Sequence, residues 1–379
     1  MRPTALKLTA ITLLFCGAIS TVNAQGKINV VTTAVPFLRI SPDARSGGMG
    51  ELGIATSADQ YSGIWNVGKA AFNASSGVSA TYTPWLKDLV NDVFLASLAG
   101  HYKFDDNQAI TTSVRYFSLG DIQFTDALGN DLTSFRPREF GVDVGYSRRL
   151  NAKHGVGIAL RYINSNLASG FNAGGTTYKT GSAVAADLAY YGNAVKASGD
   201  GWAWGAVLSN LGSKISYTDN ADAKDFIPAN LGFGANYTNK FNNNNQISIG
   251  LELNKLLVPT PPTDSAGLVD YRNKSVIGSW FSSFGDAEDG FGEEMKEFTV
   301  SVGAEYWYNN QFALRAGYFY ENKFKGNRRY FTVGVGLKYN IFGFNFAYLV
   351  PSGSGVNRNP LSNTLRFSLL FDFSQAKKK

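Results

Sequence analysis

Six consecutive residues near the N-terminus, Gly48 to Gly53, read G-M-G-E-L-G and match the spacing G-x-G-x-x-G. In a dinucleotide-binding fold this motif follows a strand and opens a helix, which brings backbone amides against a pyrophosphate. Here Ser41-Pro42-Asp43-Ala44-Arg45 precedes the glycines, and no alternation of parallel strands and helices follows. The motif therefore indicates a tightly turning segment, packed where side chains would not fit, rather than a cofactor site.

Other residue types that support acid–base or metal chemistry are sparse. The two histidines, His101 and His154, have no second ligand nearby in the sequence. Asp143 could pair with Glu252 or Glu305 if their strands faced one lumen, but charged lumen residues are ordinary in membrane barrels. No nucleophile–base spacing such as G-x-S-x-G or H-E-x-x-H is present. We therefore expect no enzymatic activity, no cofactor and no metal.

The long segment 256–296 combines aromatic and acidic side chains. Its stretch Asp286 to Gly290, D-A-E-D-G, loosely resembles part of a calcium loop, although the spacing differs from that of an EF-hand. The acidic run Asp286 to Glu294 would steer basic partner surfaces. Aromatic residues on a long loop either pack the loop itself or anchor a partner, and the sequence leaves both interpretations open. The candidate partner-binding residues are Trp280, Phe281, Phe284 and Phe291.

The elements that must position these residues are strands. Along fourteen segments, apolar residues alternate with polar or small ones, and a period of two places the two sets on opposite faces of a strand. Most segments span roughly 10–13 residues, which is enough to cross a membrane when tilted. The segments are 76–83, 92–104, 108–120, 138–150, 154–165, 181–193, 201–211, 228–240, 244–255, 297–309, 311–322, 328–340, 342–350 and 363–373.

The connections between these segments alternate between short and long. Short turns such as 105–107 and 151–153 contain Asn and Asp, which tolerate left-handed backbone. Short periplasmic turns and long external loops are typical of an outer-membrane barrel. With an even number of strands, we expect both termini on the short-turn, periplasmic side. The long connections fall around 121–137, 166–180, 212–227, 256–296 and 351–362.

The last strand segment, Leu365 to Phe373, reads L-R-F-S-L-L-F-D-F. Its alternating pattern ends on an aromatic residue, as in the assembly signal of bacterial outer-membrane barrels. The candidate signal residues are Phe367, Phe371 and Phe373.

The N-terminus predicts export. Two basic residues precede the apolar stretch Leu8 to Ile19, which is too short to span a bilayer as a helix, and Val22-Asn23-Ala24 resembles a cleavage site. The single cysteine, Cys16, lies inside this predicted signal peptide of residues 1–24, so a disulfide in the mature chain is excluded. No later stretch is apolar enough for a transmembrane helix, which leaves a barrel as the way to cross a membrane.

Composition completes the expected organisation. Only 17% of residues are charged, and the basic ones are scattered apart from Lys377 to Lys379, so we expect no nucleic-acid partner. Residues 25–75 are rich in Gly, Ser, Pro and Ala and do not alternate like membrane strands. The predicted fold is all-β, a transmembrane antiparallel β-barrel of about fourteen strands. Its parts are the signal peptide (1–24), an N-terminal periplasmic plug or arm (25–75), the barrel (76–373) and a periplasmic basic tail (374–379).

The stretch Pro36 to Asp59, P-F-L-R-I-S-P-D-A-R-S-G-G-M-G-E-L-G-I-A-T-S-A-D, closely resembles the N-terminal region of the PorV family, and Tyr61 to Asn66 also fits. PorV is the outer-membrane component of the Bacteroidota type IX secretion system, and its members resemble FadL-like fourteen-strand barrels with an N-terminal plug. The family often has a proline after the Trp-Asn pair, where this chain has Val67-Gly68. The matching plug-motif residues are Pro36, Pro42, Asp43, Arg45, Gly47, Gly48, Met49, Gly50, Trp65 and Asn66.

The resemblance implies a role in protein export rather than catalysis. PorV-like proteins associate with the SprA translocon barrel, receive cargo that bears a C-terminal secretion domain, and deliver it to the surface attachment complex that includes the protease PorU. We therefore expect these partners, together with outer-membrane lipid around the barrel. A FadL-like channel for hydrophobic small molecules is the alternative, and it requires a continuous apolar pocket beside the plug.

Overall fold

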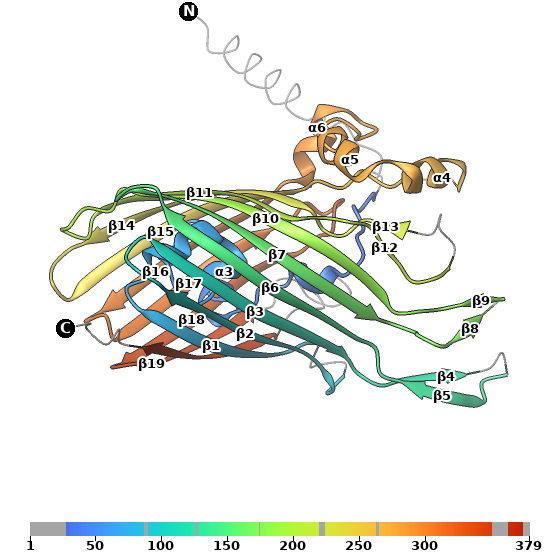
Figure 1. Cartoon of the computed structure of the whole chain (residues 1–379), viewed down its shortest axis with the longest axis horizontal. Coiled ribbons are helices and arrows are strands. Elements are labelled where there is room, and N and C mark those ends of the chain that lie inside the picture. The colour runs from blue at the N-terminus through green and yellow to red at the C-terminus, as the bar shows by residue number, and fades with distance from the viewer. Residues whose placement is uncertain are drawn as a thin grey trace, which may run out of the picture.

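Fourteen antiparallel strands close into one barrel in the computed structural model (Figure 1), which describes residues 28–86, 90–125, 128–173, 175–219, 224–262, 265–350 and 363–373. The fourteen-strand prediction is confirmed, and each predicted segment coincides with one strand to within a few residues. The barrel strands are β1 (Ser76–Pro84), β2 (Val93–Lys103), β3 (Gln108–Leu119), β6 (Arg138–Arg149), β7 (His154–Asn166), β10 (Gly181–Asn193), β11 (Gly201–Gly212), β14 (Asn230–Lys240), β15 (Asn245–Leu256), β16 (Thr299–Tyr308), β17 (Phe312–Tyr320), β18 (Arg329–Tyr339), β19 (Phe342–Val350) and β20 (Leu365–Phe373).

Alternation along each strand separates a lumen face from a lipid face. On β16, Ser301 and Glu305 are buried inside, whereas Val302 is exposed on the outer wall. Aromatic side chains on the outer wall gather toward both ends of the strands, as expected of interfacial girdles. Those exposed near the short turns include Tyr102, Trp202, Tyr339 and Phe342, and those near the long connections include Tyr82, Tyr162 and Phe331.

The connections alternate in length as predicted. In the short turns, Asn309, Asn310 and Asn340 adopt positive φ angles, a conformation that asparagine tolerates. No helix among the described residues is long and apolar enough to span a membrane. The long connections hold the hairpins β4 (Ile122–Thr125) with β5 (Asp131–Phe135), β8 (Asn172–Ala173) with β9 (Thr176–Thr177) and β12 (Ile215–Ser216) with β13 (Lys224–Asp225), and the helices α4 (Ser265–Asn273), α5 (Val276–Ser282), α6 (Phe291–Glu294) and η3 (Met295–Glu297).

The closing strand β20 pairs with β19 on one side and with β1 on the other. Phe367 and Phe373 are exposed on the lipid face, and Phe371 packs its ring 5.3 Å from that of Phe342. Because β20 completes the barrel, the aromatic row of this strand lies at the seam that assembly must close.

The double variant Phe371→Ala/Phe373→Ala is expected to insert poorly, because it removes the aromatic end of this outer row while leaving the inward residues unchanged. The measurement is the amount of folded barrel in isolated outer membranes, read as heat-dependent gel mobility. The control is Phe241→Ala, an exposed aromatic in a short turn. Wild-type levels of the double variant would refute the assignment of these residues to assembly.

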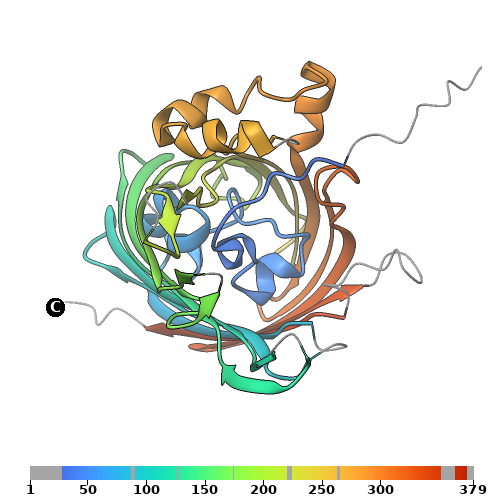
Figure 2. The same ribbon diagram turned by 90° about the vertical axis from the view of Figure 1, so that its right-hand side faces the viewer.

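Residues 28–75, here called the luminal segment, lie within the ring of strands (Figure 2). The segment consists of short elements joined by turns, and one of them, η2 (Val67–Phe72), runs close to β6, β7 and β10. Most of its residues from 41 to 56 are buried. The elements are η1 (Pro36–Arg39), α2 (Ala44–Gly47), α3 (Ser62–Trp65) and η2 (Val67–Phe72).

The luminal segment begins at the long-connection end of the barrel. The backbone N–H of Asn29 donates to the carbonyl of Phe324, between β17 and β18, at 3.2 Å. Ser76, the start of β1, instead pairs with Phe373 at the short-turn end. We expected both termini on the short-turn side. The start of β1 and the end of β20 do lie there, whereas Asn29 lies at the opposite end, because the luminal segment crosses the lumen before β1 begins. The predicted signal peptide with Cys16, and the basic tail 374–379, lie outside the described residues.

Candidate functional site

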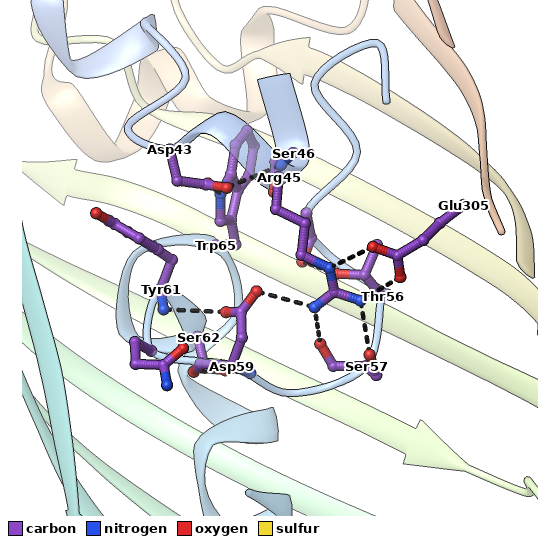
Figure 3. Close-up of polar contacts among 12 residues, drawn as sticks. Asp43, Arg45, Ser46, Thr56, Ser57, Asp59, Tyr61, Ser62, Trp65 and Glu305 are labelled. Atoms are coloured by element: carbon purple, nitrogen blue, oxygen red, sulfur yellow. Dashed lines mark hydrogen bonds and ion pairs between the residues drawn. The ribbon is translucent and has the colours of Figure 1, made fainter. Parts of the chain in front are cut away.

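A buried ion-pair network joins the luminal segment to the barrel wall (Figure 3). Arg45 in α2 donates from Nη2 to Glu305 Oε1 at 2.8 Å and from Nε to Glu305 Oε2 at 3.0 Å. The same guanidinium donates to Asp59 at 2.9 Å and to Ser57 at 2.7 Å. On the wall, Arg315 Nε donates to Glu305 Oε2 at 2.7 Å. One carboxylate of β16 thus holds two arginines, one from the segment and one from β17.

Three other residues of the predicted plug motif make contacts within the segment or to the wall. Asp43 caps α2 by accepting from the Ser46 N–H at 2.8 Å, and it also accepts from the Trp65 indole at 2.7 Å (Figure 3). Asn66 donates from its amide to the carbonyl of Tyr190 on β10 at 3.0 Å. Asp43 thus joins α2 to Trp65 within the luminal segment, and Asn66 adds a contact to the barrel wall.

The glycine motif lies directly against glycines of the wall. Gly303 and Gly317 are cross-strand partners on β16 and β17. A Cβ on Gly317 would lie 2.1 Å from the carbonyl carbon of Met49, and one on Gly303 would lie 2.3 Å from the Met49 oxygen. Gly50 has φ +68° and donates its N–H to the Thr332 hydroxyl at 2.8 Å. The motif is thus a backbone-to-wall contact, as its sequence context indicated.

The remaining plug-motif residues also lie at crowded positions. A Cβ on Gly47 would clash with the guanidinium of Arg366 on β20, and one on Gly48 would lie 3.2 Å from the Cα of Gly334. Pro36 begins η1. Pro42 lines a cavity of about 130 Å³ between the segment and the wall.

The carboxylates considered as acid–base pairs have separate partners. Glu252 accepts from the backbone N–H groups of Gly53 and Ile54, both at 2.9 Å. Asp143 forms an ion pair with Arg161. Glu305 in turn binds two arginines. Each of the three carboxylates therefore has its own structural partners, and none of these contacts pairs it with another of the three.

The two histidines also have local partners. His101 Nε2 lies 2.6 Å from the carbonyl oxygen of Ser75, and His154 Nδ1 lies 2.6 Å from the hydroxyl of Tyr190. The two contacts lie on different strands, β2 and β7. Each histidine therefore satisfies a hydrogen bond near a strand end.

A second buried network fixes the connection between β15 and β16, residues 257–298, here called the external segment. Lys255 Nζ lies 3.0 Å from Glu294 Oε1 and 2.6 Å from Glu297 Oε2. Lys325 Nζ lies 2.6 Å from Glu293 Oε1 and 3.0 Å from Glu297 Oε1. Two acids of the predicted steering run, Glu293 and Glu294, are thus paired with lysines and held inward.

The Glu297→Gln variant is expected to loosen the external segment by about 2 kcal/mol, the usual worth of a hydrogen bond to a charged group. Burial opposes ionisation of Glu297, but hydrogen bonds and charges from Lys255 and Lys325 outweigh it and lower its pKa below the ordinary 4.5. Its contribution is therefore complete above pH 4.5 and is lost as the pH falls through the lowered pKa.

The check is the rate of limited proteolysis within the external segment of the detergent-folded protein. Cleavage should accelerate in Glu297→Gln at pH 7, and the acid-induced acceleration seen in the wild type should shrink. The exposed Asp270→Asn change on α4 serves as a control for charge. Equal cleavage of both variants would contradict the role of Glu297.

Three acids of the external segment meet at one place. Oxygens of Asp286, Glu294 and Glu297 lie within 4.8 Å of one another. Lys255 bonds to two of these carboxylates, and Thr260 donates to Asp286 through its N–H at 3.0 Å. Within the described residues, the calcium-like stretch 286–290 supplies only Asp286 to this cluster, so its carboxylates do not gather as an EF-hand requires.

The candidate partner-binding aromatics are not equally available. Phe281 is 75% exposed and Phe291 is 79% exposed, whereas Phe284 is 46% exposed and Trp280 is partly buried. Ile277, 64% exposed, lies one turn before Phe281 on α5 and shares its face. In Figures 1 and 2 the helices of the external segment lie along one side of the barrel rim rather than across its opening. Exposed apolar side chains of α5 therefore lie beside the barrel rim.

A family model described as "Type IX secretion system protein PorV" matches residues 23–263. The chain belongs to the PorV family. The match covers the luminal segment and the first nine barrel strands. As a barrel of this family, the protein belongs to the outer membrane. No curated protein matches the sequence.

Solved structures show the same barrel fold at low sequence identity. The toluene transporter TbuX of Ralstonia pickettii is 14% identical, with 88% of this chain and 98% of that chain covered and a TM-score of 0.52. The toluene transporter TodX of P. putida is 11% identical, with 89% and 99% covered and a TM-score of 0.52. A FadL homologue from Pseudomonas aeruginosa is 9% identical, with 91% and 99% covered and a TM-score of 0.45. The PorV-family chain thus shares its barrel fold with the two toluene transporters.

Several site residues escaped the sequence-based predictions. Lys255 and Lys325 sit in or beside strands with no local sign of a role, and Gly303 and Gly317 are ordinary small residues of an alternating pattern. Ile277 differs: its spacing of four from Phe281 is a helical signal that the sequence carries.

Proposed function

We propose that this PorV-family protein is a non-enzymatic carrier of the type IX secretion system. In this proposal the long connections face the exterior. The external segment binds cargo with a C-terminal secretion domain beside the SprA translocon, and the protein then delivers that cargo to the PorU attachment complex. The observation that carries the proposal is the exposed apolar face of α5, in a segment whose α6 is fixed to the barrel rim by buried ion pairs.

The filled lumen supports a binding role, with the luminal segment acting as a plug. Arg45, Asn66 and Gly50 each bond to a different region of the wall. The cavity beside Pro42 is about 130 Å³, below the roughly 300 Å³ at which small-molecule sites usually begin. Larger cavities of about 390 Å³ and 450 Å³ lie toward the short-turn and long-connection ends of the segment. A barrel whose lumen is filled in this way is a rigid support for the external segment at its rim.

A channel for hydrophobic small molecules is the second candidate, because the barrel shares its fold with two toluene transporters. A continuous apolar pocket is needed. Val35, Phe117 and Leu119 line the 450 Å³ cavity at the long-connection end, but charged side chains interrupt the path beyond it. Arg115, Arg161 and Glu252 line the 130 Å³ cavity, and Arg45, Asp59 and Arg315 line the 390 Å³ cavity. Entry of a hydrophobic dye into liposomes that contain the purified barrel would support this candidate. Entry no faster than into empty liposomes would contradict it.

The carrier proposal is tested by Phe281→Ala/Phe291→Ala. Both rings are largely exposed, so the barrel should fold normally, while loss of an anchor worth about 2 kcal/mol lowers affinity roughly 30-fold. The measurement is the amount of secretion-domain cargo and SprA that co-purifies from native membranes. A deletion of 278–294 would be less selective, because it also removes Glu293 and Glu294 from their lysines.

The matched control is Phe241→Ala, which removes a 63% exposed ring at the opposite end of the barrel. Cargo capture should be retained in this control. Full capture and full secretion in the double variant, with the barrel present at normal levels, would remove α5 and α6 from the mechanism.

A further inference from the structure

A lysine-rich basin opens near the long-connection end of β10 and β11. Its volume is about 670 Å³, within the range of ligand sites. Four lysines line it, two from the β12–β13 region, one before β10 and one after α4. Hydroxyl groups supply most of the remaining lining. The lining residues are Lys179, Thr180, Ser182, Ser213, Lys214, Ser216, Lys224, Lys274, Ser275 and Val276.

The basin opens on the outer side of the barrel wall. Ser182 and Val184 are both exposed and lie two residues apart on β10, so they share the outward face. Val184 is 62% exposed in the row that contacts lipid. The backbone N–H of Ser213 donates to the Val184 carbonyl at 3.0 Å, which places the basin beside this residue. The lysines thus lie at the edge of the lipid-facing wall, at the level expected for the lipid headgroups.

The walls of the basin are held in place by one of its own lysines. Lys214 Nζ donates to the carbonyls of Arg272 and Lys274, each at 2.6 Å, and lies 4.1 Å from the ring centroid of Phe226. These bonds tie the turn between α4 and α5 to the chain that follows β11. Lys274 is consequently held at the basin rather than carried on a free loop.

The charge of the basin favours an anion. Asp219 pairs with Lys179 at 2.6 Å, an exposed contact that solvent screens. Asp225, next to Lys224 in sequence, lines a different cavity together with Pro261 and Tyr271. Burial, followed by the charge of Lys224, lowers the pKa of Lys214, and the charge of Asp225 acts in the opposite direction.

We propose that this basin binds the phosphate groups of a phosphorylated glycolipid, the lipopolysaccharide of the outer leaflet. Lysine is suited to phosphate as a mobile point charge, and basic pockets at the headgroup level of membrane proteins bind anionic lipids. The lipid is favoured over a soluble anion because the basin continues the lipid-facing wall at Val184. The inference rests on the outward orientation proposed above, and such a site would orient the barrel beneath its external segment.

The test measures binding of bisphosphorylated lipid A, dephosphorylated lipid A and inorganic phosphate to the detergent-purified full chain. The variant Lys179→Gln/Lys224→Gln/Lys274→Gln leaves Lys214 and its structural bonds intact. We expect the phosphorylated lipid to bind at least about tenfold more weakly to this variant, and salt to weaken binding to the wild type. Dephosphorylated lipid A should bind both proteins equally.

A control with the same charge loss at the short-turn end, Lys153→Gln/Lys196→Gln/Lys240→Gln, should bind phosphorylated lipid A within about twofold of the wild type. Equal affinity of the basin variant and the wild type would overturn the proposal. Inorganic phosphate that binds as tightly as the lipid would also overturn it, in favour of a soluble-anion site. The orientation is checked separately by labelling Lys274→Cys and Lys196→Cys in intact cells, so a failure of topology is distinct from a failure of lipid binding.

Discussion

Replacing Glu305 with alanine is expected to lower the free energy of unfolding by about 3–5 kcal/mol, because two buried guanidinium groups lose their shared carboxylate. The side chains of Arg45, Arg315 and Glu305 are 10%, 0% and 4% exposed, so water cannot replace the lost charge. The luminal segment would also lose its ionic contact with β16. The measurement is unfolding of the detergent-folded protein in urea, together with ion conductance in planar bilayers.

The Arg45→Ala variant makes the prediction specific. This variant retains the Arg315–Glu305 ion pair. Asp59 loses Arg45 but still accepts a hydrogen bond from the backbone N–H of Tyr61 at 2.9 Å. Its destabilisation should therefore be smaller than that of Glu305→Ala, and Arg45→Ala/Glu305→Ala should be more stable than Glu305→Ala alone. The reverse order of stabilities would show that the ion pairs are not what retains the segment.

The Gly317→Ala variant is expected to lose about 2–3 kcal/mol and to gain conductance, because a single methyl group forces the luminal segment off the wall. The added Cβ would lie 2.1 Å from the Met49 carbonyl carbon and 2.2 Å from the Gly50 nitrogen. Both atoms belong to the backbone, so no side-chain rotation relieves the clash. Alanine itself suits a strand at least as well as glycine does, so the loss reports on the contact.

The control for this substitution is Gly285→Ala in the external segment, where an added Cβ meets nothing within 4 Å. Gly303→Ala should resemble Gly317→Ala, because its Cβ would reach the same Met49 carbonyl at 2.3 Å. Unfolding and conductance identical to those of the wild type in both wall variants would mean that the segment is free to shift inside the barrel.

Local sequence patterns are sufficient to predict the barrel. A period of two along Thr299–Tyr308 and the other strands is local information, since each strand must face lipid on one side and a polar lumen on the other. Asparagines in the short turns and the greater length of the other connections then indicate which ends of the strands share each side of the membrane. The residues from Pro36 to Asn66 likewise pointed to the family, because that segment carries a specific motif.

Tertiary structure decided what each motif residue contacts. Arg45 meets Glu305 across 260 residues of sequence, and Gly50 meets Thr332 across 282, so no local pattern could pair them. The inward turn of Glu294 in α6 depends on Lys255 on β15, which lies 39 residues earlier in the sequence. Phe281 and the partly buried Trp280 point in different directions because consecutive helical residues are roughly 100° apart, but only the packing of α5 decides which of the two is covered.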